Sequence, residues 1–551
     1  MNHTLTPTGD AAQELAHLEN AITDQLFQLQ PSYAVFLGLH QYDGRVPVLT
    51  REATDLWLVG ADRLLSQLRA IPEEKLAEAR KHDRLLLELL IESSRFDLQE
   101  SHDLDRNPMS YVGSASLTAY MVREYAPLSQ RVEAMVHTLN EIPRLLRDGL
   151  ERLDPTLPQP FVRLALSIGG GLPGHFAEAE ALATHASPHL GERFREARVP
   201  AETALGAFLR TLEEECLPRA TPEFALGPAK YQRLLWVREG IRTPFAEVAE
   251  AGWRDLRRNQ ARLAEVAAHE DPPRTIAECL EELYRDHPSS NTLIEEARRF
   301  VDETRRFVEE RELATVPPEA RCRVEETPVY GRALSTASMN PPGPYDVAGD
   351  EGIYFVTPVD LTWSPAKQEE WLRSLNRPML RNITAHEVYP GHYLQFLHFR
   401  KGADSTARRV YLSSSFAEGW AHYCEQLTIE QGMGSDDDGR AEVAQLHDAL
   451  LRDCRLLSSV GLHTGGMTLA QSAQLFQQQA HMEALPAERE AIRGTFNPEY
   501  FCYTLGKLAI LEARNRYLAG MFHGSLKGFH DRLLSFGCPP VGLLDRLFGA
   551  T

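Results

Sequence analysis

The sequence predicts a mainly α-helical protein, a large helical domain with a deep cleft and one small β-sheet. Two observations predict the helices: apolar residues recur at helical spacing over long stretches, and Pro- or Gly-rich breakers separate those stretches. A third predicts the sheet, because a single β-branched and aromatic run stands apart from the helical pattern. With 43% hydrophobic and 25% charged residues, the composition is that of an ordinary globular protein.

The strongest helical patterns extend through both halves of the chain. We expect helices over His82–Glu100, Arg131–Leu153, Glu247–Val266, Asn291–Leu313 and Glu442–Leu457. Breakers are expected at Pro155–Pro160, Gly169–Pro173, Pro272–Pro273 and Pro317–Pro318.

The chain length favours two lobes. At 551 residues it exceeds the roughly 250–300 residues that one core usually serves. We therefore predict an N-terminal helical lobe over residues 1–315 and a C-terminal lobe over 316–551, which carries the candidate site described below.

The predicted sheet belongs to a stretch that is poor in helix signals, residues 321–360. Its centre is Pro341-Pro342-Gly343-Pro344, and it ends in Gly352-Ile353-Tyr354-Phe355-Val356-Thr357. The second run indicates a short strand beside the site helix. An extended surface loop is the alternative.

Charge and cysteine usage narrow the partners. A net charge of −20 argues against nucleic acid and anionic membranes as binding partners. Nowhere do 18 apolar residues occur together, so no membrane span is expected. Residues 1–26 contain four acidic residues and no apolar run long enough for a signal peptide. The seven cysteines include no Cys-x-x-Cys pair. A cytoplasmic protein, monomer or homodimer, is the expectation.

The candidate site begins with two histidines six positions apart. His386-Glu387 and His392 resemble the zinc motif His-Glu-x-x-His, in which both imidazoles lie on one helical face. Six positions on an ideal helix would turn the second imidazole about 240° away. Pro390 and Gly391 explain the spacing if they form a bulge that returns His392 to the face of His386. The alternative is a helix ending at Tyr389 with two unrelated histidines.

A second segment carries a third possible ligand. Glu418, His422 and Glu425 stand at i, i+4 and i+7, on one face of a helix. In gluzincin peptidases the third zinc ligand is a Glu on a helix downstream, which fits Glu418. His422 and Glu425 would then orient a ligand imidazole. Two alternatives stay open: His422 as the third ligand, and a buried salt-bridge cluster without metal.

These motifs resemble the bacterial "domain of unknown function 885" family, whose members are read as gluzincin-type metallopeptidases. The resemblance rests on His386 to His392 with Glu418-Gly419-Trp420-Ala421, and extends to Pro31–Asp43, Arg106-Asn107-Pro108, Pro341–Phe355, Gly461-Leu462-His463 and Tyr503-x-x-Gly506. It implies one Zn²⁺ per chain. The chain departs from the family pattern at Ser459 and at Glu499-Tyr500, which leaves its substrate specificity open.

The expected chemistry is hydrolysis by a zinc-activated water, with Glu387 as the general base. The resemblance points to Tyr503 and His463 as donors to the oxyanion; either could instead be a core residue. Tyr354 and Phe355, on the predicted strand, would bind an extended peptide by edge pairing. Arg455, Arg493 and Arg514 are possible partners for a substrate carboxylate.

The predicted function is therefore a zinc metallopeptidase acting on short peptides. A zinc hydrolase of a non-peptide amide or ester would need the same residues. A helical binding protein without turnover is the third possibility, although such a protein has no use for the general base Glu387.

Overall fold

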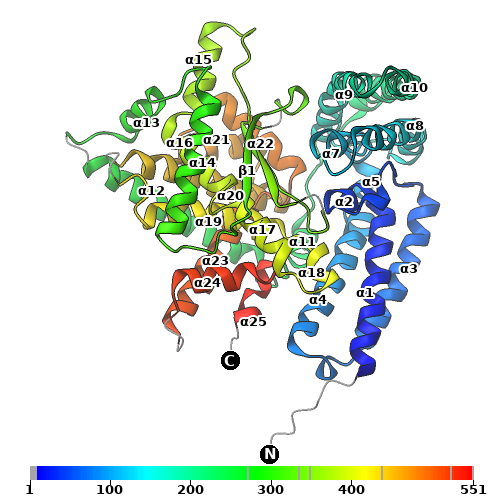
Figure 1. Cartoon of the computed structure of the whole chain (residues 1–551), viewed down its shortest axis with the longest axis horizontal. Coiled ribbons are helices and arrows are strands. Elements are labelled where there is room, and N and C mark those ends of the chain that lie inside the picture. Colours follow the sequence, from blue (N-terminus) through cyan, green and yellow to red (C-terminus); the bar gives the residue numbers. More distant parts are fainter. Residues whose placement is uncertain are drawn as a thin grey trace, which may run out of the picture. The chain divides into compact units, whose positions relative to one another are not determined.

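The computed structural model describes residues 9–269, 272–332, 335–346, 349–435, 439–520 and 524–548 (Figure 1). It is mainly α-helical with one three-stranded sheet, as predicted. In these ranges no helix is both long and apolar enough to cross a membrane. The deep cleft stays a prediction.

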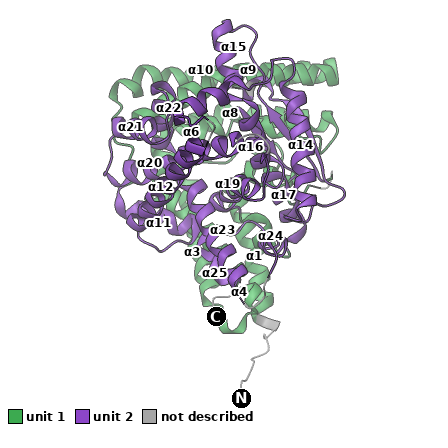
Figure 2. Ribbon diagram, turned by 90° about the vertical axis from the view of Figure 1, so that its left-hand side faces the viewer, with its two compact units in different colours: residues 1–226, 343–349, 404–411 green, residues 227–342, 350–403, 412–551 purple. Residues whose placement is uncertain are grey.

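The chain forms two compact units, coloured separately in Figure 2. Unit 1 comprises residues 1–226, 343–349 and 404–411, and unit 2 comprises residues 227–342, 350–403 and 412–551. The division therefore differs from the predicted lobe boundary at 315/316. Residues 227–315 join the C-terminal half because α12 (Phe245–His269) packs along α20 (Arg440–Thr464).

Unit 1 is built from helices. Its helices are α1 (Gly9–Leu29), α2 (Pro31–Phe36), α3 (Arg51–Ala70), α4 (Glu78–Arg95), α5 (Asp103–Arg106), α6 (Met109–Gly113), α7 (Thr118–Val122), α8 (Leu128–Arg152), α9 (Gln159–Ala186), α10 (Pro188–Thr211) and α18 (Thr406–Val410). Helix α10 packs against both α8 and α9 (Figure 1).

The breaker predicted at Gly169–Pro173 is wrong, because α9 continues through it. A Cβ at Gly169 would lie 2.5 Å from a methyl carbon of Leu209 on α10, so this glycine permits close helix packing. The breaker at Pro155–Pro160 is confirmed: α8 ends at Arg152, and Pro160 lies in the first turn of α9.

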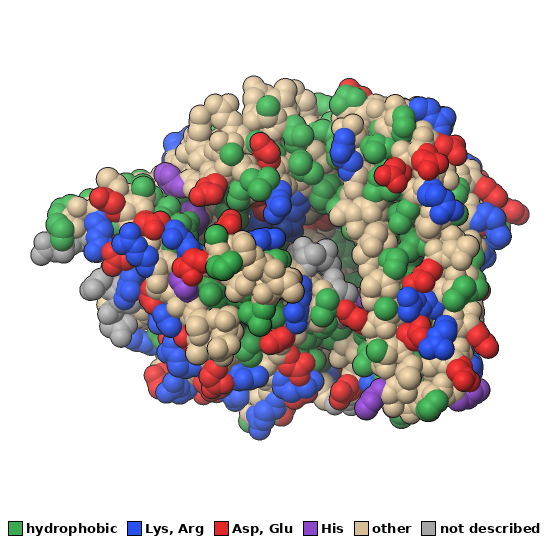
Figure 3. All heavy atoms as spheres, turned by 90° about the horizontal axis from the view of Figure 1, so that it is seen from above, with side chains coloured by type: hydrophobic (Ala, Val, Ile, Leu, Met, Phe, Trp, Pro, Cys, Tyr) green, Lys and Arg blue, Asp and Glu red, His purple; other side chains and the backbone are tan. Residues whose placement is uncertain are grey.

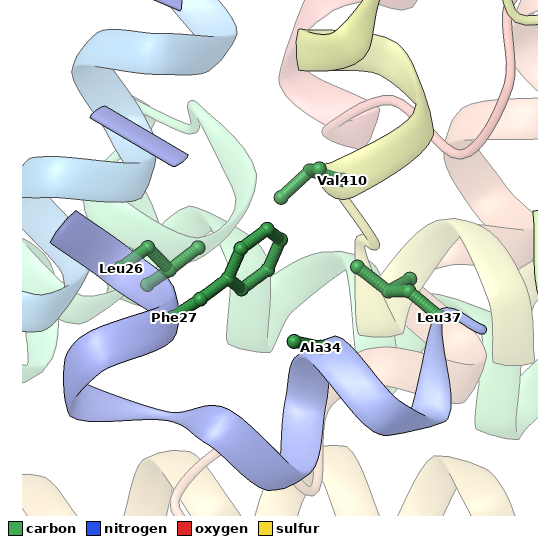
Figure 4. Packing of buried hydrophobic residues seen from close by; sticks show 5 residues of the cluster. All are labelled: Leu26, Phe27, Ala34, Leu37 and Val410. Atoms are coloured by element: carbon green, nitrogen blue, oxygen red, sulfur yellow. The ribbon is translucent and has the colours of Figure 1, made fainter. Parts of the chain in front are cut away.

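The segment 404–411 completes the core of unit 1. Val410 packs with Leu26, Phe27, Ala34 and Leu37 in one buried cluster (Figure 4). The backbone N–H of Ala407 also donates to the Glu19 carboxylate at 2.6 Å. A late part of the sequence thus stabilises the first two helices.

Unit 2 holds the sheet and the candidate site. Its remaining helices are α11 (Pro228–Glu239), α13 (Ile276–Arg285), α14 (Leu293–Glu310), α15 (Pro365–Ser374), α16 (Arg377–Glu387), α17 (His392–Gly402), α19 (Ser414–Glu430), α21 (Leu469–Gln479), α22 (Ala484–Phe496), α23 (Cys502–Ala519), α24 (Leu526–Leu534) and α25 (Leu544–Phe548). The five helices predicted from periodicity are all present as α4, α8, α12, α14 and α20.

The sheet has the order β1-β3-β2. Strand β3 (Glu351–Val356) is central and pairs in parallel with β1 (Arg321–Glu326) and antiparallel with β2 (Ala337–Asn340). The predicted strand is therefore confirmed. Its predicted use for edge pairing is wrong, because both edges of β3 are already paired.

The surface charge is mixed. On the face drawn in Figure 3, acidic and basic side chains alternate and do not gather in a patch of one sign.

Candidate metal centre

The Pro-Gly insertion lies between two helices. Helix α16 ends at Glu387 and α17 begins at His392. The N–H of Gly391 donates to the carbonyl of Ala385 at 3.0 Å, and the N–H of Leu394 donates to Val388 at 3.3 Å. Each bond spans six residues instead of the usual four. The insertion therefore widens the backbone path locally, as the bulge hypothesis predicts.

Gly391 is required at this point by close packing. A Cβ there would lie 1.7 Å from the carbonyl oxygen of His386, which no side chain can accommodate. The peptide bond between Tyr389 and Pro390 is cis. The indole N–H of Trp420 donates to the Pro390 carbonyl at 2.9 Å and holds the loop from the side of α19.

The insertion brings His386 and His392 together. Their rings lie 4.8 Å apart, centroid to centroid, at 90° to each other. Both Nε2 atoms point to the same carboxylate oxygen, Oε2 of Glu418, at 3.4 and 3.5 Å. One ligand atom from each of the three residues lies within 4.8 Å of the others.

This geometry fits a small divalent cation. Nitrogen and oxygen ligands at about 2.0–2.2 Å from a tetrahedral zinc ion lie about 3.3–3.5 Å from one another. Two imidazoles and one carboxylate are also a donor set that zinc accepts. His386, His392 and Glu418 are thus the residues that could hold the metal.

Helix packing places Glu418 beside the two imidazoles. The Ser413 hydroxyl caps α19 by accepting from the N–H of Phe416. One residue after Glu418, a Cβ on Gly419 would lie 2.4 Å from the backbone of Gly506 on α23. Two glycines in contact let α19 and α23 cross closely. The sequence Glu418-Gly419-Trp420 thus supplies a carboxylate, a helix contact and the anchor of the Pro-Gly loop.

Behind the ligands, Glu425 orients His386. The Glu425 carboxylate accepts from His386 Nδ1 at 2.6 Å, so Nε2 is the ring nitrogen that faces Glu418 and is available to a metal ion. His422 Nδ1 lies 3.1 Å from Glu425, and the Arg452 guanidinium lies 2.9 Å from it. Among the described residues, His422 lies outside the ligand group. The geometry agrees with the orienting role predicted for His422 and Glu425.

The electrostatics of the centre favour a cation. Although burial lowers the pKa of His386, its bonds to Glu418 and Glu425 raise that pKa to about 10. Burial would raise the pKa of Glu418, but the two imidazoles hold it well below its usual range. The carboxylates of Glu418 and Glu425 thus favour a positive charge at the buried His386 imidazole. A metal ion and a proton would compete for this imidazole.

Glu387 lies beside this group without belonging to it. Burial and the nearby Glu418 raise the pKa of Glu387, while the two imidazoles lower it. The Glu387 carboxylate accepts the backbone N–H of Met339 on β2. A carboxylate with a raised pKa next to a cation site suits a general base.

Tyr503 approaches the centre from α23. It precedes Gly506 by one helical turn, so the close crossing at Gly506 brings Tyr503 toward Glu418. Burial and Glu418 raise the pKa of Tyr503, which keeps the phenol protonated as a donor. In the described part of the chain its hydroxyl makes no hydrogen bond, and Arg452 lies 5.5 Å from its ring centroid.

The prediction of His463 as an oxyanion donor is wrong. His463 Nε2 bonds to the Gly494 carbonyl at 2.9 Å, and its ring stacks on Tyr231. His463 also stands 11 residues beyond Arg452 on α20, which is about 16 Å along a helix. It is a buried core residue whose pKa burial lowers to about 4.

The substrate-binding role predicted for Tyr354 and Phe355 is not supported by their positions. Tyr354 is fully buried, and Phe355 is 7% exposed. The Tyr354 hydroxyl faces Thr384 of α16 at 3.4 Å. The Tyr354 side chain therefore packs the sheet against α16, the helix that carries His386.

Sequence reasoning missed three residues of this centre: Arg452, Met339 and Trp420 as the loop anchor. Arg452 pairs with Asp448 one turn earlier on α20 at 2.6 Å. An Asp and an Arg at i, i+4 are common on exposed helices, so that spacing carried no signal of a buried site.

Three comparisons relate the chain to known proteins. The model of the family described as "Bacterial protein of unknown function (DUF885)" matches residues 31–547. The comparison with curated proteins gives no match. Among solved structures, "a putative lipoprotein of unknown function" from Shewanella oneidensis is similar at 23% identity and a TM-score of 0.80, covering 97% of this chain and 99% of that chain. "The putative lipoprotein" from Colwellia psychrerythraea is similar at 17% identity and a TM-score of 0.82, covering 98% of both chains.

The likeness to the solved structures confirms the mainly α fold, and the descriptions of those structures correct the expected location. The prediction of a cytoplasmic protein is contradicted, because both solved neighbours are described as lipoproteins. The cysteines on which it rested are free, and six of the seven are buried. Buried thiols are shielded from oxidants, so their number indicates no compartment.

Proposed function

Since the chain belongs to the family of bacterial proteins of unknown function DUF885, matched over residues 31–547, we propose that it is a zinc-dependent metallopeptidase. The observation that carries the proposal is the convergence of His386 and His392 on one oxygen of Glu418, at 3.4 and 3.5 Å. Such a trio beside a free carboxylate is the arrangement of gluzincin peptidases. A purely structural ion cluster would not need the adjacent Glu387.

Each residue has one task in this proposal. Zn²⁺, when bound by His386, His392 and Glu418, would act as a Lewis acid that makes water nucleophilic near neutral pH. Glu387 accepts the proton of the attacking water and passes it to the leaving amine. Tyr503, which stays protonated, donates a hydrogen bond to the oxyanion.

Strand β2 supports a peptide as the substrate. It is an edge strand of the described sheet, and its Met339 N–H already points to Glu387. An extended peptide could pair with such an edge through main-chain hydrogen bonds, independent of its side chains. We therefore assign the pairing with an extended peptide, which the sequence suggested for β3, to the edge strand β2.

The test combines metal analysis with two substitutions. We expect about one zinc per purified chain, lost in Glu418→Ala. Glu387→Gln should retain the zinc and lose activity on short peptides by about 10²–10⁴-fold, because only proton transfer is removed. Glu370→Gln, at an exposed position of α15 that makes no ion pair in the described part of the chain, is the control and should behave as wild type.

Three outcomes separate the alternatives. Zinc binding without hydrolysis of any peptide, but with hydrolysis of small esters or amides, would identify the non-peptide hydrolase. Equal activity in Glu387→Gln and wild type would remove the assigned base. A protein that binds no zinc at all would refute the proposal.

A further inference from the structure

A cationic and aromatic cluster adjoins Tyr503. The Arg455 guanidinium lies 5.3 Å from the ring centroid of Tyr503 and 5.0 Å from that of Tyr500. Glu490 of α22 binds Arg455 through two bonds of 2.8 and 2.9 Å and accepts the Tyr500 hydroxyl. The Arg455 guanidinium thus connects Tyr503, beside the candidate metal centre, to Glu490 on α22.

Arg493 adds a second guanidinium to this cluster. It lies on α22, one turn after Glu490, and stands 5.2 Å from the ring centroid of Tyr500. Unlike Arg455, it is exposed. In the described part of the chain no carboxylate lies within ion-pair distance of Arg493. Burial and Glu418 raise the pKa of Tyr503, whereas Arg455 and Arg493 lower it, so both guanidinium groups act electrostatically on this phenol.

The charges in this cluster do not balance. Arg455 and Arg493 carry two positive charges, and Glu490, committed to Arg455, carries one negative charge. An aromatic face holds a guanidinium in a fixed orientation while leaving its N–H donors available to a planar anion.

We propose that Arg493 binds a carboxylate of the substrate, which makes the protein selective for peptides that carry a carboxylate near the bond to be cut. The inference rests on the proposed peptidase function and names its substrate class. A guanidinium can donate two parallel hydrogen bonds to a carboxylate. A terminal carboxylate and an Asp or Glu side chain share this chemistry.

The other two candidate arginines are already used within the protein. Arg455 is bound through two hydrogen bonds to Glu490, and Arg514 pairs with Glu430 at 2.7 Å and contacts the Tyr423 hydroxyl. Recruiting either for a substrate would break an existing ion pair. Arg493 has no such ion pair to break in the described part of the chain.

The experiment compares three peptides on the zinc-loaded full chain. The first has its C-terminal carboxylate as the sole carboxylate, the second is the same peptide amidated, and the third is amidated but contains one Asp near its C-terminus. We expect wild type to cleave the first with a kcat/KM about 10- to 100-fold above the second, as for a charge-assisted hydrogen bond.

Substitutions on α22 then assign the preference. Arg493→Gln should bring the ratio of the first to the second peptide close to one, and Arg493→Lys should restore part of it. Arg489→Gln removes another exposed guanidinium from the same helix and should leave the ratio at its wild-type value. Circular dichroism and zinc content should be unchanged in all three variants.

The outcomes separate the two proposals. A third peptide cleaved as fast as the first would identify the side chain as a sufficient source of the carboxylate, in support of the inference. Cleavage of all three at equal rates by wild type would overturn the role of Arg493 and leave the peptidase standing. Absence of any cleavage would overturn the peptidase and this inference with it.

Discussion

Glu425 is the residue on which the orientation of the candidate metal centre depends. Burial alone would raise its pKa, but Arg452 and His422 hold that pKa below the usual range, so Glu425 is anionic. Its charge fixes the proton of His386 on Nδ1 and makes the opposite nitrogen a better ligand. A neutral amide at this position would keep the acceptor and lose the charge.

We therefore predict that Glu425→Gln weakens zinc affinity by about 10- to 100-fold. Competition with a chelator of known affinity measures the change in the purified protein. Arg452 keeps Asp448 at 2.6 Å as a partner, so the variant should fold. An affinity equal to that of wild type would show that Glu425 is only structural.

At the same scale, the sequence identified the candidate ligands but not their surroundings. His386, His392, Glu387 and Glu418 were identifiable because metal chemistry restricts residue type and spacing. His463 was misplaced because a family pattern gives no distance, and the helix carries it away from the centre. Arg452 escaped notice because its importance comes from burial, which spacing does not encode.

At the scale of elements, the crossing of α19 and α23 positions both Glu418 and Tyr503. A Cβ on Gly419 would lie 2.4 Å from the backbone of Gly506, which cannot yield as a flexible side chain would. Gly419→Ala must therefore separate the helices. We expect it to destabilise the protein by about 1–3 kcal/mol or more, as overpacking does.

The free energy of unfolding in urea measures this cost. Gly170→Ala is a suitable control, because this glycine is also helical and a Cβ there would meet no atom within 4 Å. It should be neutral or stabilising by up to about 1 kcal/mol. If both substitutions proved equally mild, the close crossing would have no energetic role.

Elements were predicted unevenly for a physical reason. Helices α8 and α12 follow from local periodicity, so their positions were predicted to within about three residues. The place of β3 within its sheet depends on β1 and β2, whose pairing is set by contacts distant in sequence. The same limit applies to Gly169–Pro173, where packing against α10 overrides the local helix breakers.

At the scale of the whole molecule, the chain enters unit 1 three times. The segments 343–349 and 404–411 lie in unit 1, although the sequence on both sides of each belongs to unit 2. Segment 404–411 also separates the two histidines from Glu418 along the chain. A lobe boundary at one position could not describe this path, because compact units form through contacts and not through sequence continuity.

The first of these segments is held in unit 1 by an ion cluster that should make stability depend on pH. His40 lies 3.2 Å from Asp43 and 3.3 Å from Asp346, and its ring stacks 3.5 Å from that of Tyr125. Arg123 also binds Asp346, at 3.2 Å. Burial lowers the pKa of His40, but bonds to the two carboxylates raise it from the ordinary 6.5 to about 9.

A pKa that is raised in the folded state stabilises the fold when the group is protonated. The contribution of His40 should be complete below about pH 6.5 and disappear as the pH rises through about 9. We expect the melting temperature of wild type to exceed that of His40→Gln at pH 6, with the difference fading by pH 9.5. Subtracting the variant at each pH removes the titration of other groups. His17→Gln, on the exposed side of α1, should follow wild type throughout, and a difference that stayed constant with pH would show that His40 acts through packing and not through its charge.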